Sequence, residues 1–406
     1  MKDLPSPRPS LRSGRAPEGR PFQRVTRLRR PPLRIWVWTA VTLVVAAVAV
    51  VLWRTSDVVA TSTTTAAAPT VPDAAPADEL APAWTASTTD GPRRVVEGGR
   101  VLVTDEHGVA MLDAGTGTEA WHYRRSNATL CDATAVDGVV IAVFRTTGRC
   151  NEAVALTATT GERDWYRNVR FRTDVDLAST TQILLAASPT GIVTIDPTGN
   201  NTRWRYAPAT GCRFVGADVG SSGVVVLQRC EGSTPLQVQL LDGFGGTVIW
   251  TRDLDTEGRT ARLAGVGRLV DVVVGDTVHV IDPDDGTLRE PLPLPALAAG
   301  DDVRSEPLQQ AEVGDVTLLW ARGTAWALDQ ETGRPRWSVP ATGLPALGED
   351  DTVVVPEDGA LVRRSVADGS ERDRSAAAGT LPAGGRTALL GPVVVYATSD
   401  QVLGLR

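Results

Sequence analysis

The segment VAMLDAGTGTEAW (109–121) decides the fold, because it recurs as AVALTATTGERDW (153–165), VQLLDGFGGTVIW (238–250) and AWALDQETGRPRW (325–337). In each copy an apolar run ends at Asp or Thr, a Gly follows four positions later, and a Trp follows eight positions later. An Asp side chain can accept backbone N–H bonds within a turn, and Gly accepts the positive φ that a tight turn needs. A Trp that begins the next strand can bury its ring between neighbouring sheets. The pattern therefore predicts a strand, a tight turn and an outer strand in each copy.

These three roles recur along most of the chain. The residues that fill them are Asp113, Gly117, Trp121, Gly161, Trp165, Asp196, Trp204, Asp242, Gly246, Trp250, Asp282, Gly286, Asp329, Gly333 and Trp337. Eight apolar runs of strand length lie between residues 101 and 397, each followed by a second strand, and the Trp-equivalent positions are 36 to 47 residues apart. That spacing is close to the roughly 40–50 residues of a four-stranded propeller blade. We therefore expect an all-β chain whose residues 80–406 form an eight-bladed β-propeller of four-stranded antiparallel blades, preceded by one transmembrane helix.

The two ends of the repeat region predict how the ring closes. Trp84, in PAWTAS (82–87), resembles the Trp of an outer strand but has no hairpin before it, whereas the last hairpin ends at Arg406 with no outer strand after it. We expect residues 80–89 to supply the outer strand of the blade formed by 386–406, since propellers remove their open edge by such a join.

The N-terminal part predicts a membrane anchor. Residues 1–34 carry ten basic and two acidic residues, a net charge of +8, so the remainder of a chain whose total is −7 carries −15. Residues 35–53 contain no charge and have Trp at both ends, and nineteen residues give a helix of about 28 Å, close to the bilayer core. We expect a single-pass protein of the cell membrane, with residues 1–34 as a basic cytoplasmic arm and the C-terminal body outside the cytoplasm. A cleaved signal sequence, with processing near Val58-Val59-Ala60, is the alternative.

Residues 54–79 are rich in Thr, Ala and Pro and have no apolar periodicity. We expect this segment to be an extended stalk that packs against nothing.

The four cysteines form two pairs, Cys131 with Cys150 and Cys212 with Cys230. We expect each pair to bracket the first hairpin of a blade, with one Cys before its first strand and the other after its second. Antiparallel pairing would then join each couple at the open end of the hairpin as a disulfide, in keeping with an exported body. Four buried free thiols are the alternative.

Taken together, the Asp-x3-Gly-x3-Trp copies on β-hairpins resemble the PQQ-type propeller repeat. That repeat occurs in eight-bladed quinoprotein dehydrogenases and in the outer-membrane assembly lipoprotein BamB. The resemblance covers about residues 80–406 and implies the fold, but the family includes enzymes, scaffolds and sensor ectodomains. The dehydrogenases use a vicinal Cys–Cys disulfide and a Ca²⁺-held quinone, and this sequence has no adjacent cysteines.

Other catalytic signals are weak. The three histidines, His107, His122 and His279, fall in turns or strands of the repeat, where structural roles are expected. The segment DPDDG (282–286) has its Gly one place too early for an EF-hand loop, and GFGGTV (243–248) lacks the last Gly of a dinucleotide loop. We therefore expect no enzyme activity, no cofactor and no metal site.

The acidic body argues against nucleic acid as a partner. The first functional hypothesis is a non-catalytic scaffold that binds another envelope protein through propeller loops. The alternative is a ligand-sensing or quinone-binding propeller that uses its central channel. A sensor needs convergent polar groups at the axis, whereas a scaffold needs an exposed apolar patch on a face or rim.

Overall fold

In the computed structural model the described residues are 32–54, 56–89, 94–169, 171, 175–199, 201–233, 235–297, 300 and 302–406. Most of the basic arm expected at 1–34 lies outside these residues. The chain divides into two compact units, Met1–Thr55 and Ser56–Arg406.

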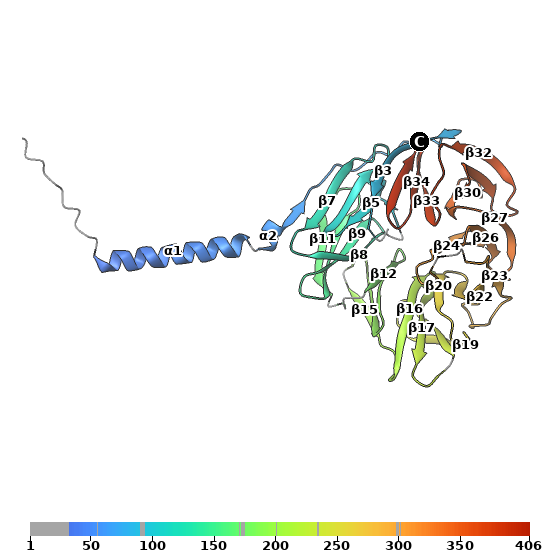
Figure 1. Cartoon of the computed structure of the whole chain (residues 1–406), viewed down its shortest axis with the longest axis horizontal. Helices are drawn as coiled ribbons and strands as arrows, with labels where there is room; N and C mark the ends of the chain where they lie inside the picture. The colour runs from blue at the N-terminus through green and yellow to red at the C-terminus, as the bar shows by residue number, and fades with distance from the viewer. Residues whose placement is uncertain are drawn as a thin grey trace, which may run out of the picture. The chain divides into compact units, whose positions relative to one another are not determined.

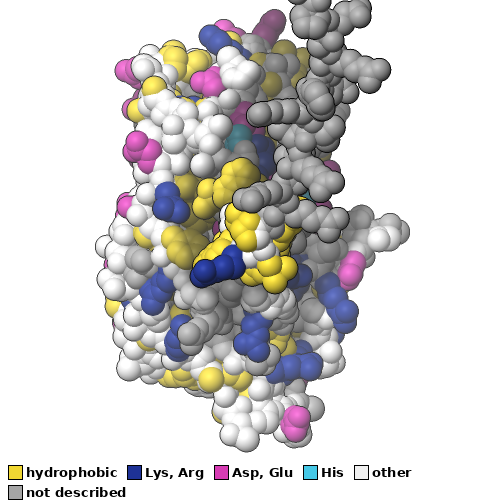
Figure 2. Space-filling view, turned by 90° about the vertical axis from the view of Figure 1, so that its left-hand side faces the viewer, with side chains coloured by type: hydrophobic (Ala, Val, Ile, Leu, Met, Phe, Trp, Pro, Cys, Tyr) yellow, Lys and Arg dark blue, Asp and Glu magenta, His cyan; other side chains and the backbone are white. Residues whose placement is uncertain are grey.

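The first unit contains one long helix, α1 (Leu33–Arg54). The helix is 22 residues long, and it is the one helix in the described part of the chain that is long and apolar enough to cross a membrane. All its side chains are exposed, and between Arg34 and Arg54 they are apolar except for Thr39 and Thr42. Apolar side chains gather in the middle of the face drawn in Figure 2. The observed helix extends the expected 35–53 span by two residues at its start and one at its end.

The second unit is built of eight sheets arranged around a common centre (Figure 1). Each sheet has a core of four antiparallel strands, which are consecutive in the sequence except in the last sheet, and we call these cores blades 1 to 8 in chain order. The eight-bladed propeller predicted from the repeat is confirmed.

Blades 1 to 4 occupy the first half of the ring. Their strands, from the first to the last in each blade, are β4 (Val96–Glu97), β5 (Arg100–Asp105), β6 (Gly108–Asp113) and β7 (Glu119–Arg125); β8 (Thr129–Val136), β9 (Val139–Arg145), β10 (Cys150–Thr157) and β11 (Arg163–Asn168); β12 (Asp176–Ser179), β13 (Leu184–Ser188), β14 (Gly191–Ile195) and β15 (Thr202–Tyr206); and β16 (Cys212–Gly220), β17 (Gly223–Cys230), β18 (Leu236–Leu241) and β19 (Val248–Leu254).

Blades 5 to 8 complete the ring. Their strands, in the same order, are β20 (Ala261–Val266), β21 (Val270–Val274), β22 (Thr277–Ile281) and β23 (Leu292–Pro293); β24 (Leu308–Val313), β25 (Val316–Ala321), β26 (Thr324–Asp329) and β27 (Pro335–Pro340); β29 (Ala346–Leu347), β30 (Thr352–Glu357), β31 (Ala360–Ser365) and β32 (Glu371–Ala377); and β33 (Gly385–Leu390), β34 (Val393–Ala397), β35 (Gln401–Leu405) and β3 (Pro82–Ser87).

The last strand of blade 8 comes from the N-terminal side of the body. Strand β3 pairs antiparallel with β35, with Thr85 opposite Leu403, and the short strand β28 (Gly343–Leu344) adds in parallel to β33 on the other side of the same sheet. The backbone groups of Ala81 and Arg406 exchange two hydrogen bonds of 3.0 Å each, which extends the join to the end of the sequence. This pairing joins the two ends of the ring and leaves no open sheet at the seam.

The core lies between the blades. Eight clusters of buried apolar side chains each draw their members from two neighbouring blades, such as Val109 and Met111 of blade 1 with Phe144 and Val154 of blade 2. The first strands of neighbouring blades contact one another around the axis, as β16 and β20 do. These first strands therefore form the wall of a central channel.

The prediction that residues 54–79 form a stalk that packs against nothing is wrong for much of this segment, because it pairs with the propeller. The helix α2 (Asp57–Ala60) leads into β1 (Thr61–Thr63), which pairs antiparallel with the outer edge of β7. Further on, Ala66 N donates to Thr160 O, and β2 (Glu79–Leu80) pairs in parallel with β32. Backbone groups of an extended Thr-rich segment can add to an exposed sheet edge without any apolar periodicity, and so the composition gave no signal of this packing.

The positions of the strands within each blade also differ from the sequence-based expectation in one respect. The eight apolar runs expected to open the blades are their second strands, for example β9 for VVIAVF (139–144) and β17 for VVVLQ (224–228). The first, innermost strands precede them and carry more glycine and polar residues, as in β20, ARLAGV (261–266).

Candidate functional site

The repeat residues lie at the turn between the third and fourth strands of the blades. In blade 1, Asp113 Oδ1 accepts the backbone N–H of Thr116 at 3.0 Å, and Gly117 N donates to Asp113 O at 2.8 Å. Gly117 has a φ of +69°, which a residue with a Cβ rarely adopts. In blade 6 the hydrogen bond from Arg336 lowers the pKa of Asp329 to about 2.

Each repeat Trp ties its blade to the next blade. The indole N–H of Trp121 donates to Ala158 O at 2.9 Å, and Trp165, Trp204, Trp250 and Trp337 make equivalent bonds to Pro197, Gly243, Pro283 and Val366. Trp84 does the same from the closing strand to Ala114 O at 2.8 Å. In the next blade, an Asp, Thr or Ser at the end of the third strand or directly after it begins the turn. The acceptor is in every case the backbone carbonyl of the residue that follows this Asp, Thr or Ser. The Trp set is thus engaged in packing between blades and does not gather around a common site.

Both cysteine pairs are joined as disulfides. Cys212 begins β16 and lies opposite Cys230 at the end of β17, which is the open end of the first hairpin of blade 4. In the other pair Cys150 lies after the second strand, β9, as expected, but Cys131 lies within the first strand, β8, and not before it. Bulges at Cys131 and between Cys150 and Glu152 bring these two strand ends to a Cα–Cα distance of 6.0 Å.

The three histidines lie apart from one another, and the Asp-rich turn bonds its own backbone. His107 Nδ1 lies 3.0 Å from Ala128 O, and His122 Nε2 lies 2.8 Å from Ser62 Oγ in the N-terminal strand. His279 lies in β22, where burial lowers its pKa. Asp282 accepts the backbone N–H of Asp284 at 2.8 Å, as expected for turn chemistry. Across the described ranges, no group of three His, Cys, Asp or Glu side chains is placed to hold a metal ion.

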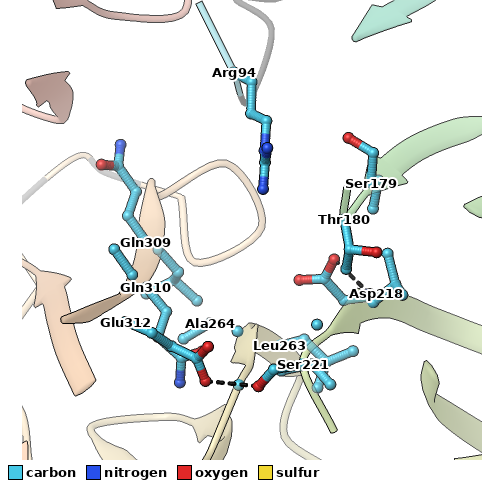
Figure 3. A pocket seen from close by; sticks show the side chains of 18 of the residues that line it. Arg94, Ser179, Thr180, Asp218, Ser221, Leu263, Ala264, Gln309, Gln310 and Glu312 are labelled. Carbon is cyan, nitrogen blue, oxygen red and sulfur yellow. Dashed lines mark hydrogen bonds between the residues drawn. The ribbon is translucent and has the colours of Figure 1, made fainter. Parts of the chain in front are cut away.

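A cavity of about 1110 Å³ lies along the axis of the propeller (Figure 3). Its wall comes chiefly from the first strands of blades 3 to 6 and from the segment that begins blade 8. The first strands approach closely because glycine lines them. A Cβ on Gly220 would lie 1.1 Å from Val266 O, and a Cβ on Gly265 would lie 2.3 Å from the Cβ of Gln310.

Polar side chains in this wall connect neighbouring blades. Glu312 of β24 accepts from Ser221 Oγ at 2.8 Å and from the backbone N–H of Arg268, so one carboxylate joins the inner ends of blades 4, 5 and 6 (Figure 3). Gln309 Nε2 donates to Gly384 O at 2.8 Å and joins blade 6 to blade 8.

Two more residues of the wall act in the same way. Gln310 Nε2 donates to Asp271 Oδ2 at 2.7 Å, and Arg262 Nη1 donates to the carbonyls of Val303 and Glu306 at 3.0 and 2.5 Å. Asp271 is fully buried, and burial raises its pKa to about 7. Arg94 differs from these groups, since its exposed side chain projects into the cavity from the segment before β4 (Figure 3).

A second feature lies on the outer rim of blades 4 and 5. Phe244, Val248 and Ile249 fall within six residues at the turn into β19 and are 53%, 42% and 50% exposed. Leu288, in the equivalent turn of blade 5, is 43% exposed, and Gly286 of that turn accepts a hydrogen bond from Arg252 of β19. We call these four side chains the rim cluster; its member Phe244 also lines the axial cavity and lies beneath the guanidinium of Arg203 of blade 3. They are four of the seven large apolar side chains that are exposed in the described part of residues 73–406. The sequence analysis considered 243–248 only as a nucleotide loop and did not anticipate this surface.

The sheet order, the blade-to-blade Trp bonds and the eight interblade clusters define a β-propeller of the PQQ-repeat class. The family described as "Outer membrane protein assembly factor BamB" matches residues 44–226 and 236–399, and the chain belongs to this family. A comparison with curated proteins finds no match.

Solved structures resemble the chain at low sequence identity. A quinohemoprotein alcohol dehydrogenase from Comamonas testosteroni has 12% identity and a TM-score of 0.50, and the match covers 81% of this chain and 76% of that one. BamB from Moraxella catarrhalis has 14% identity and a TM-score of 0.48, covering 80% of this chain and 99% of that one. At these identities the likeness concerns the fold alone.

Proposed function

We propose that the chain is a non-catalytic scaffold of the cell envelope that binds a protein partner through propeller loops on the rim of blades 4 and 5. The observation that carries this proposal is the rim cluster of Phe244, Val248, Ile249 and Leu288. Exposed apolar side chains gathered in one region of a soluble body are typical of protein contact sites.

The axial cavity supports the same choice. The carboxylate of Glu312 and the amides of Gln309 and Gln310 make hydrogen bonds between blades. A ligand in the channel would compete with these bonds, so the polar wall is better explained by the cohesion of the ring.

The scaffold is held in the cell membrane by α1, with the N-terminus in the cytoplasm and the propeller outside. The apolar helix and the two disulfides support a location in the envelope. Protease added to intact spheroplasts should digest the propeller. Digestion only after lysis would contradict the orientation, and a mature N-terminus near Thr61 would indicate a cleaved signal.

The test of binding uses the full-length chain in intact cells treated with a chemical crosslinker. We expect the wild-type chain to form a defined crosslinked species with a second protein, and the variant Phe244→Ser with Ile249→Thr to lose it. The matched control is Tyr166→Ser with Leu347→Ser, which removes two exposed apolar side chains elsewhere on the propeller. Equal yields from both variants would contradict a role for the rim cluster.

A second candidate is a ligand-sensing or quinone-binding propeller. The cavity of about 1110 Å³ and the side chain of Arg94 within it favour a small anionic molecule. Arg94→Ala would then abolish the function in cells, whereas Ile249→Thr, which lies outside the cavity lining, would leave it intact.

A further inference from the structure

The outermost strand of each blade has one outer edge. Most of these edges are either covered by another strand or protected against strand pairing, but one edge is neither covered nor protected. Three of the outermost strands have seven residues: β7, β19 and β32. The chain's own N-terminal segment pairs with two of them, as β1 on β7 and β2 on β32. In the described part of the chain no strand pairs with the outer edge of β19 (Figure 1).

The remaining outer strands carry features that hinder strand pairing. Strand β27 begins and ends with proline, at Pro335 and Pro340, β3 begins with Pro82, and β23 has only two residues, of which one is Pro293. Strands β11 and β15 are shorter and carry charged residues along their length. Proline cannot donate to a ladder, and charges on an edge oppose the approach of another strand.

Strand β19 lacks these protections over its first half. Its sequence VIWTRDL has no proline, and Val248 and Ile249 are about half exposed at its beginning. Charge appears only in its second half, where Arg252 donates to Gly286 O, Asp253 is exposed two residues after Thr251, and Asp255 follows the strand. An edge of this kind is complementary to a strand that is apolar at one end and basic at the other.

We infer that the outer edge of β19 is the docking site for an extended segment of the partner protein, which adds to blade 4 as a fifth strand. The segment carries apolar side chains beside Val248 and Ile249 and a basic side chain beside Asp253. The binding mode is the one that β1 uses on β7, where a three-residue strand adds antiparallel to an outer edge. This inference rests on the proposed function and specifies how the partner is held.

The experiment places a photo-crosslinking amino acid at single positions of the full-length chain in living cells and maps the crosslinked peptides by mass spectrometry. The test positions are Thr251 and Asp253, exposed and two residues apart in β19; Phe244 probes the turn and Ser338 in β27 is the matched control. We expect Thr251 and Asp253 to crosslink to one partner segment at sites about two residues apart, since side chains alternate along a strand. Ser338 should give no crosslink to that segment.

The outcomes separate the inference from the proposed function. Crosslinks from Phe244 without any from Thr251 or Asp253 would overturn strand addition and leave the scaffold proposal standing. No crosslinked protein at any of these positions would overturn both. Crosslinks to β19 of a second copy would replace the partner with self-association and so overturn the inference.

A variant gives an independent readout. Ile249→Lys places a charge on the apolar half of the edge and should lower the crosslink yield from Thr251 by about tenfold. Tyr166→Lys, on the exposed part of β11, should leave that yield unchanged. An unchanged thermal unfolding midpoint in both variants shows that the propeller is intact, and an unchanged yield in Ile249→Lys would overturn the inference.

Discussion

The seam of the ring is the place where one substitution should weaken the join between the two ends of the body. Trp84 belongs to the closing strand β3 and lies opposite Gly404 of β35. Its indole N–H donates to Ala114 O of blade 1 at 2.8 Å. A Cβ on Gly117 would lie 2.5 Å from its ring, so the indole also fills the space beside the first repeat turn. One side chain thus contacts both sides of the seam.

Replacing Trp84 with Ala removes this ring and leaves a carbonyl without its donor. Trp→Ala substitutions in cores cost about 3–5 kcal/mol, and because Trp84 is partly exposed we expect about 3 kcal/mol. Trp121→Ala, where the same bond lies inside the ring and the side chain is fully buried, should cost about 5 kcal/mol. Tyr166→Ala, an exposed aromatic side chain on an outer strand, should cost less than about 0.5 kcal/mol.

The assay is urea unfolding of the full-length chain in detergent micelles, followed by far-ultraviolet circular dichroism, with amide hydrogen exchange as a second measurement. In Trp84→Ala we expect faster exchange in β3 and β35 together, while β17 on the far side of the ring keeps its protection. If Trp84→Ala unfolds at the same urea concentration as Tyr166→Ala, and β3 exchanges as in the wild type, the reasoning about the seam is refuted.

Three further predictions concern the body. Cys212→Ala with Cys230→Ala should lower the free energy of unfolding by about 3 kcal/mol, since the bond closes a loop with a sequence separation of 18, and reduction of the wild type should give a loss of the same order in urea unfolding. Asp271 has a folded pKa of about 7 against about 3.9 unfolded, so the folded state holds a proton that the unfolded chain releases, and stability should fall as pH rises from about 4 to 7. Asp271→Asn should remove this fall and be the more stable form at pH values above 7, and a pH profile equal to that of the wild type would count against it. Arg125 is 4% exposed and paired with Glu152 and Asp57, so Arg125→Ala should lower the free energy of unfolding by about 3–5 kcal/mol. Arg124→Ala, at a side chain that is 33% exposed, should lower it by about 1 kcal/mol or less in the same denaturation assay.

The sequence predicted those parts of the propeller that each blade repeats for a local reason. The turn after Asp113 needs a positive φ at Gly117, and the Trp that follows needs space against the next blade, so both recur with fixed spacing. The second strands are apolar on both faces because they lie between two neighbouring sheets, and they are visible as runs such as residues 139–144. These features depend on short-range geometry and appear directly in the sequence.

The innermost strands were not visible in the same way. Strand β20 has a glycine at 265 because a neighbouring strand approaches there, and a polar residue at 262 because its guanidinium reaches a neighbouring blade. The composition of the innermost strands is set by contacts with residues distant in sequence, so these strands show no regular apolar pattern by which they could be recognised. The packing of β1 on β7 has the same origin, since it depends on an edge that only the folded blade provides.

The rim cluster could not be predicted for a related reason. Phe244, Val248 and Ile249 look like ordinary apolar residues of a strand and its turn, and only the position of β19 at the periphery leaves them exposed. The placement of Cys131 before the first strand was wrong, since Cys131 lies within β8 at the point where its pairing with β9 shifts register between Leu130 and Asp132.

The measurement that tests the scaffold proposal most directly is the size of the complex that contains the full-length chain after mild detergent extraction from its own membrane. Native gel electrophoresis would compare the wild type with two variants, Ile249→Lys on the rim and Arg94→Ala in the axial cavity. We predict that the wild type and Arg94→Ala migrate in a complex larger than the single chain, while Ile249→Lys migrates as the chain alone. A complex that persists in Ile249→Lys, or that is lost in Arg94→Ala, would contradict the account.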